Sequence, residues 1–263
     1  MTETPDTLRG GFLTGPRFGM TALVVSIMAL VLAVAPYATG RDFDGRVRSY
    51  LLENPEILQE VSLKLEQKVQ QGQVVQARVH AQEMTARIVA NPSLLRIDAR
   101  DPSFGPVDAR VTVVEFFDFR CPGCKSTAPE VLRLMQVHPD VRFVFKDWPI
   151  LDRGTDDTSH YAARAAQAAH LQGKYLPVFR ALMAEPALTK AAVDRILAAN
   201  GVALPTARTA MAGPEIARHL ADIQMSAANL GLQGTPTFFI NGRAMASIQP
   251  ADIDRAIRVA KAG

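Results

Sequence analysis

Residues 111–125 read VTVVEFFDFRCPGCK and join an apolar run directly to a pair of cysteines. The run Val111–Phe119 is apolar on both faces, which is typical of a central strand covered on either side. A helical pattern of apolar residues begins directly after the cysteines. The stretch therefore predicts a buried strand that turns into a helix, with Cys121 and Cys124 at the turn.

The cysteine spacing indicates redox chemistry. Cys121 is expected near the helix N-terminus, where free backbone N–H groups and the helix dipole stabilise a thiolate, the form that attacks disulfides. Pro122 suits the first helical turn. Cys124 lies one turn further on and can reach back to resolve a mixed disulfide. The loop Cys121-Pro122-Gly123-Cys124 therefore predicts a dithiol that cycles with its disulfide.

Other uses of two cysteines fit the sequence less well. A zinc site needs two further ligands, and the five histidines are dispersed without ligand spacing. A structural disulfide across so short a loop adds little stability, and a c-type haem site needs a histidine where Lys125 stands. We expect no bound metal and no external cofactor.

The sequence after the cysteines mixes helical and strand patterns. Residues 158–230 are rich in alanine and helical, with breaks at glycine or proline. Asn241-Gly242 is a two-residue hairpin turn that predicts a short strand after it. The other expected strands and the last helix cover Val141–Phe145, Thr237–Ile240 and Pro250–Lys261. On the N-terminal side, the turn-rich residues 101–106 mark a domain boundary.

Residues 19–37 predict a targeting segment. Met20–Tyr37 carries no charge, arginines precede it and aspartates follow it. A transmembrane anchor is therefore expected, with residues 1–18 as a cytoplasmic tail. A signal peptide cleaved after Ala35 is the alternative, although Pro36 disfavours cleavage. Both interpretations place the folded part outside the cytoplasm, where disulfides persist, and a buried helix ranks third.

Residues 41–90 show apolar positions at helical spacing among Glu, Gln, Lys and Arg. Asn54-Pro55 predicts a break or a fresh helix start. The apolar stripe is too narrow for a core of its own, so it is expected to pack on a second copy or another domain. A simple spacer helix is the alternative.

Several of these segments resemble the DsbA-like branch of the thioredoxin superfamily. VVEFFDFRCPGCK (113–125) resembles its active-site segment, LQGTPTFFING (232–242) its cis-proline loop, and residues 159–169 part of its inserted helical domain. VRSYLLENPEILQE (47–60) resembles the N-terminal helical region through which copper-sensitivity-suppressor C-type and Com1-like members oligomerise.

The resemblance implies an α/β protein with a thioredoxin-like fold. The catalytic domain is expected at residues 93–263, with a helical insertion at about 155–230. An oligomerisation region at residues 38–92 and the membrane-anchor helix precede it. The basic residues are scattered and the net charge is only +3, so the sequence gives no reason to expect nucleic-acid binding.

The resemblance also implies roles for individual residues. Pro236 is expected to be cis and to face the cysteines, and the Thr235 backbone to pair with a substrate chain. Glu115 is costly inside an apolar run unless it is protonated or paired, and the family uses an acid there to accept a proton beneath the resolving cysteine. Arg142 or Lys146 could pair with it.

The motif departs from the strongly oxidising members at Gly123, where they carry a histidine between the cysteines. Arg120 and Lys125 flank the motif and could compensate in part. Oxidase, isomerase and reductase activity towards exported proteins in the periplasm therefore stay open, as does the membrane redox partner that resets the pair. Alternatives are a Cu(I)-binding or copper-tolerance protein that uses both thiolates and a chaperone that presents the same fold.

Overall fold

The computed structural model describes residues 16–38 and 40–263, without the side chains of residues 16–19 and 36–42. Most of the cytoplasmic tail expected for residues 1–18 lies outside the described residues. The chain divides into two compact units, of which the first ends at Gln70 and the second runs from Gln71 to Gly263. We describe each unit by itself.

The first unit is helical. It contains α1 (Pro16–Ala38), α2 (Gly40–Glu53) and the first part of α3 (Glu56–Ala90). The break predicted at Asn54-Pro55 is confirmed, since Asn54 lies between α2 and α3 and its side-chain amide donates to the Tyr50 carbonyl at 2.8 Å. The apolar stripe on α3 is exposed, and Val61 and Leu65 keep 56% and 60% of their surface accessible.

The expected transmembrane anchor is not supported. Within the residues that the structure describes, no helix is both long enough and apolar enough to cross a membrane.

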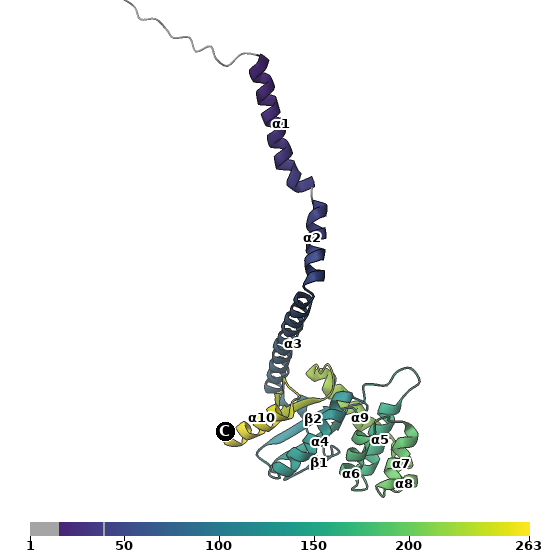
Figure 1. Ribbon diagram of the computed structural model, residues 1–263. Helices are drawn as coiled ribbons and strands as arrows, with labels where there is room; N and C mark the ends of the chain where they lie inside the picture. The colour runs from purple at the N-terminus through teal and green to yellow at the C-terminus, as the bar shows by residue number, and fades with distance from the viewer. Residues whose placement is uncertain (1–15, 39) are drawn as a thin grey trace, which may run out of the picture. The chain divides into compact units, whose positions relative to one another are not determined.

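The second unit is built on one mixed sheet (Figure 1). In the described part of the chain, its strand order is β1-β3-β2-β4-β5. The strands are β1 (Ser103–Phe104), β2 (Thr112–Phe117), β3 (Arg142–Asp147), β4 (Thr237–Ile240) and β5 (Arg243–Ala244). β2 and β3 run parallel, and the other neighbours run antiparallel. The expected strands are confirmed, but β1 was missed inside the turn-rich boundary.

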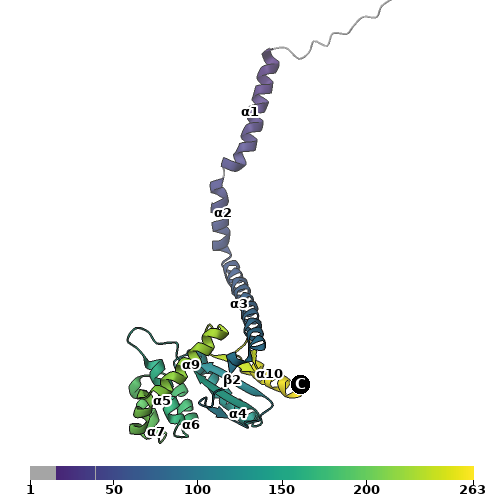
Figure 2. The same cartoon turned by 180° about the vertical axis from the view of Figure 1, so that it is seen from behind.

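Helices connect and cover the strands. α4 (Pro122–Val137) joins β2 to β3, as a parallel pair requires. Between β3 and β4 come α5 (Thr158–His170), α6 (Tyr175–Ala184), α7 (Lys190–Ala199), α8 (Leu204–Ala212) and α9 (Pro214–Leu230). The views from the two sides show α5, α6 and α7 gathered beside the sheet (Figures 1 and 2), and Figure 1 shows α8 among them. α10 (Pro250–Ala262) closes the chain and contacts α4 and β4.

Strand register assigns side chains to the two faces of the sheet. Glu115 of β2 is opposite Phe145 of β3, and Phe116 is opposite Lys146. Because side chains alternate along a strand, Glu115 and Phe145 share one face, and Phe116 and Lys146 share the other. The first face packs on α6, with the rings of Phe145 and Phe179 only 4.8 Å apart. Cys124 of α4 lies near Glu115 on the same face.

The second face packs on α9. Trp148 lies against Phe116 at a ring separation of 6.3 Å, and its indole N–H donates to Gln224 of α9 at 2.6 Å. The end of α3 also belongs to this unit, since its residues Met84 and Ile88 join the buried core. The compact units therefore divide inside α3, whereas the sequence analysis placed the domain boundary after residue 92.

Candidate active site

The two cysteines lie where the sequence predicted, at the turn from β2 into α4. Cys121 is the N-cap residue of α4, and Pro122 occupies the first helical turn. Both thiols are free, with Cys121 8% exposed and Cys124 fully buried. Cys121 therefore keeps a small accessible surface, while Cys124 keeps none.

The surroundings of the two sulfur atoms separate their acidities. The hydrogen bond from the Cys124 thiol is the largest cause that lowers the pKa of Cys121 to about 5, and Thr235 and the backbone groups of Cys124 and Gly123 add to it against burial. Burial and the bond to Cys121 raise the pKa of Cys124 far above its ordinary value. At neutral pH, Cys121 is a thiolate and Cys124 is a thiol that donates to it.

The loop before β4 lies against the cysteines. The Thr235–Pro236 peptide bond is cis, as the resemblance implied. In its thiol form, Cys121 donates to the Thr235 carbonyl at 3.1 Å. A Cβ atom added to Gly123 would come within 3.2 Å of Pro236 Cδ. Glycine therefore leaves room for the loop at a position where the strongly oxidising relatives carry histidine.

Glu115 is buried beneath Cys124. It is 2% exposed, and neither of its carboxyl oxygens has a hydrogen-bond partner among the described residues. Burial, and secondly the charge of Asp147, raise the pKa of Glu115 to about 8. The Glu115 carboxylate in turn raises the pKa of Cys124.

No basic residue of the next strand pairs with Glu115. Lys146 and Arg142 alternate onto the opposite face of the sheet. The Lys146 ammonium binds Asp101 at 2.6 Å, and Arg142 donates to Ser103 at 3.4 Å. Alternation along β3 thus rules out both candidate partners, a point that the unknown register left open in the sequence.

The flanking cations do not compensate for the missing histidine either. Arg120 binds Asp156 at 2.8 Å. Lys125 donates to the Leu182 and Glu185 carbonyls at 3.2 and 2.5 Å, and so caps the C-terminal end of α6. Hydrogen bonds, rather than a cation, stabilise the Cys121 thiolate.

Asp118 is a positioning residue that the sequence analysis missed. It is 2% exposed and lies three residues before Cys121. Its two oxygens accept from Arg120 N, Ser159 Oγ, Ile150 N and Leu151 N at 2.7–3.1 Å. It thereby ties the cysteine loop to α5 and to the loop after β3. The signal in the sequence was a second acidic residue inside the apolar run VTVVEFFDF, which needs hydrogen-bond partners if it is buried.

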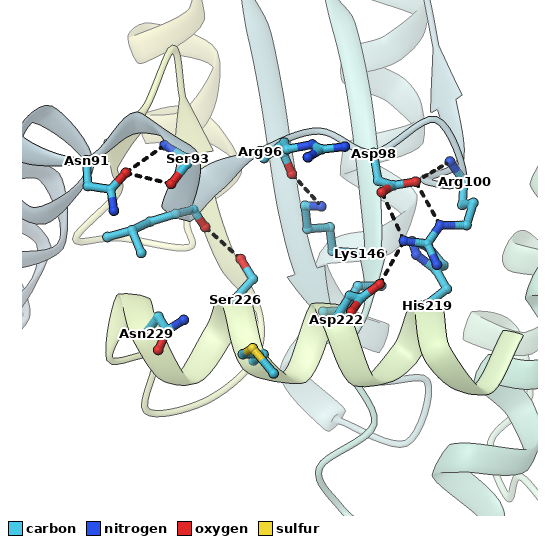
Figure 3. A pocket seen from close by; sticks show the side chains of 13 residues that line it. Asn91, Ser93, Arg96, Asp98, Arg100, Lys146, His219, Asp222, Ser226 and Asn229 are labelled. Atoms are coloured by element: carbon cyan, nitrogen blue, oxygen red, sulfur yellow. Dashed lines mark hydrogen bonds and ion pairs between the residues drawn. The ribbon is translucent and has the colours of Figure 1, made fainter. Parts of the chain in front are cut away.

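A polar cavity of about 570 Å³ lies between residues 91–100 and α9 (Figure 3). Its lining includes Lys146 and therefore belongs to the face opposite Glu115. Arg100 binds both Asp98 and Asp222 at 2.8 Å. The cavity contains neither cysteine and is not part of the dithiol site.

The fold and the dithiol together define a disulfide oxidoreductase of the thioredoxin-like class. The family model described as thioredoxin matches residues 98–258, so the chain belongs to the thioredoxin family. A second model, described as the N-terminal domain of the copper resistance protein ScsC, matches residues 41–71. Both resemblances noted in the sequence are thereby confirmed.

Two solved structures show the extent of the similarity. A thioredoxin-like oxidoreductase from Silicibacter pomeroyi is 34% identical, covers 66% of this chain and 99% of its own, and has a TM-score of 0.60. BcfH from Salmonella enterica Typhimurium is 27% identical, covers 90% of this chain and 99% of its own, and has a TM-score of 0.58.

The curated relatives are longer proteins. One named Na(+)/H(+) antiporter NhaA 3, from Salinispora tropica, is 36% identical over 55% of this chain and 22% of its own length. The chain thus spans about a fifth of the length of the curated relatives that it matches.

Proposed function

We propose that the protein exchanges disulfides with exported proteins, with Cys121 as nucleophile and Cys124 as resolving thiol. The observation that carries this proposal is the contrast between the two thiols, one a thiolate at the helix start and one buried and protonated. The thiolate is the form that attacks a disulfide. The buried Cys124 thiol can react only within the molecule, with the disulfide that forms at Cys121.

The electrons and protons balance in two steps. The Cys121 thiolate attacks a client disulfide, forms a mixed disulfide and releases one client thiolate. Cys124 then gives its proton to Glu115 in its carboxylate form, the minor form at neutral pH because the pKa of Glu115 is about 8. Cys124 attacks Cys121, which forms the Cys121–Cys124 disulfide and releases the second client thiolate. The reverse sequence oxidises a client dithiol, and no external cofactor enters either direction.

Thr235 and Pro236 are proposed to dock the client backbone. The Thr235 carbonyl accepts from Cys121 only while Cys121 carries its proton. Once Cys121 is a thiolate, this carbonyl is free to accept from a client N–H, as in the addition of a strand. The client disulfide is then held beside the attacking sulfur.

An extracytoplasmic location belongs to the same proposal, since a dithiol that acts on exported proteins works where disulfides persist. A membrane redox partner would reset the pair there. Association of copies through residues 41–90, supported by the exposed apolar stripe on α3, would hold several dithiols together and favour isomerisation.

Copper binding is a second candidate, favoured by the match of residues 41–71 to the ScsC domain. Two thiolates suit Cu(I). The raised pKa of Cys124 opposes it, because a ligand thiol must lose its proton. Among the described residues, no three His, Cys, Asp or Glu side chains are grouped to hold a metal. Titration of the reduced protein with Cu(I) against a competing chelator separates the two functions.

The test of the main proposal is reduction of insulin by dithiothreitol with catalytic protein. The wild type should accelerate precipitation, and Cys121→Ser should not. Cys124→Ser should accumulate mixed disulfides with clients, because resolution is lost. Equal activity of wild type and Cys121→Ser would refute the assignment of the nucleophile.

A further inference from the structure

A second buried carboxyl group lies on the same face of the sheet as Glu115. Asp147 ends β3 and is opposite Phe117 of β2, while Glu115 is opposite Phe145. Glu115 and Asp147 are therefore diagonal neighbours on one face of the sheet, since Asp147 lies two residues beyond the position opposite Glu115. Asp147 is 1% exposed and Glu115 is 2% exposed, so water screens neither carboxyl group well.

Aromatic rings surround the pair. On β3, Phe145 is opposite Glu115 and two residues before Asp147, and its ring is 6.1 Å from that of Phe117 and 4.8 Å from that of Phe179. In such an apolar medium, two negative charges repel strongly, and a pair of nearby carboxyl groups holds on to one proton.

The two carboxyl groups differ in their hydrogen bonds. Asp147 accepts from the Tyr175 hydroxyl at 2.6 Å and from the Gln167 amide at 2.7 Å. Glu115 accepts none among the described residues. Hydrogen bonds to a carboxylate favour its ionised form, so the negative charge belongs on Asp147 and the shared proton on Glu115.

Other titratable groups also act on this pair. Cys124 faces Glu115 from α4, Tyr175 faces Asp147 from α6, and His170 of α5 lies edge-on to the Tyr175 ring. The charge of Asp101, beside β1, raises the pKa of Asp147, and the charge of Asp147 raises that of Glu115. Lys146, the cation next in sequence, lines the cavity on the α9 face, where it donates to the Arg96 carbonyl (Figure 3). It also binds Asp101.

We propose that Asp147 is a positioning residue that carries the negative charge of a coupled carboxyl pair and thereby keeps Glu115 protonated for delivery to Cys124. The inference rests on the proposed function of Cys124 as resolving thiol. When a client thiolate opens the Cys121–Cys124 disulfide, Cys124 leaves as a thiolate and takes the proton of Glu115. In the reverse step, the Glu115 carboxylate takes that proton back, and Asp147 exchanges none.

Burial raises the pKa of both acids, with Asp147 at about 7 and Glu115 at about 8. Loss of the Asp147 charge should therefore lower the pKa of Glu115. A shift of about one unit or more is expected for a carboxyl group that loses a close like charge.

The test follows the carboxyl carbons of Glu115 and Asp147 by NMR in the full-length reduced protein labelled with ¹³C, from pH 4 to 10. Asp147→Asn should lower the Glu115 midpoint by about one unit or more. The pH midpoint for release of Cys124 in single-turnover opening of the disulfide should move the same way. Asp194→Asn is the matched control, because Asp194 also accepts from a tyrosine hydroxyl, that of Tyr161, but lies on α7.

An unchanged Glu115 midpoint in Asp147→Asn, or an equal shift in Asp194→Asn, overturns the proposal. If Asp147→Asn does not fold, the wild type decides, because each carboxyl signal of a coupled pair shows both titration steps. Two independent single-step curves would then overturn it. The NMR titration needs no turnover, so its failure is distinct from failure of the insulin assay.

Discussion

Replacing Cys124 by alanine should raise the pKa of Cys121, because the Cys124 thiol is the largest cause of the low value of about 5. A hydrogen bond to a charged group contributes about 1.5–3 kcal/mol. At about 1.36 kcal/mol per pKa unit, its loss corresponds to about one to two units. The Cys121 pKa is then expected at about 6 to 7.

Cys124→Ser is the matched variant, since its hydroxyl can still donate to the Cys121 sulfur. It should keep a pKa close to that of the reduced wild type. The assay follows the thiolate absorbance at 240 nm and the rate of iodoacetamide alkylation from pH 3 to 9. Only Cys121 titrates in both variants, so each curve has one step.

Equal midpoints for the alanine and serine variants would refute this reasoning. The thiolate would then owe its stability to the helix N-terminus and the Thr235 loop rather than to its partner. In the reduced wild type, slower alkylation of Cys121 than of Cys124 would contradict the assignment of roles to the two thiols.

Three further predictions follow from the site. Above pH 8, Glu115→Gln should have a free energy of unfolding in urea that is a few kcal/mol higher than that of the wild type. The folded pKa of Glu115 is raised to about 8, so the stability that it contributes below about pH 4.5 is lost as the pH rises through about 8. Gly123→Ala should lower both Tm and the rate of insulin reduction, since its Cβ meets Pro236 Cδ at 3.2 Å, whereas Gly72→Ala, which meets nothing within 4 Å, should not. Deletion of residues 1–70, which leaves the second compact unit whole, should give a monomer by light scattering that reduces insulin but no longer refolds scrambled ribonuclease. An unchanged mass or unchanged refolding would contradict the role proposed for this part of residues 41–90.

Much of the fold could be predicted because its signals are local. The apolar run before Cys121 predicted a doubly covered strand, and Asn241-Gly242 predicted a hairpin turn. The two-residue strand Ser103–Phe104 was not predicted, because two residues show no periodicity and their pairing with β3 arises only in the tertiary fold. The expected membrane anchor at residues 19–37 found no support within the described residues, although its lack of charge favoured one.

The sequence by itself determined the dithiol, since residue type and spacing place the two thiols within one turn at the start of a helix. The resemblance added the loop at Thr235-Pro236. Only the tertiary structure decided what surrounds Glu115. The register of β2 against β3 sends Lys146 to the opposite face and Asp147 to the same one, and Tyr175 and Gln167 reach Asp147 from 28 and 20 residues away. Side-chain alternation has a period of two, so a shift of one residue in register would exchange cation and acid beneath Cys124, and no local pattern in the sequence records that register.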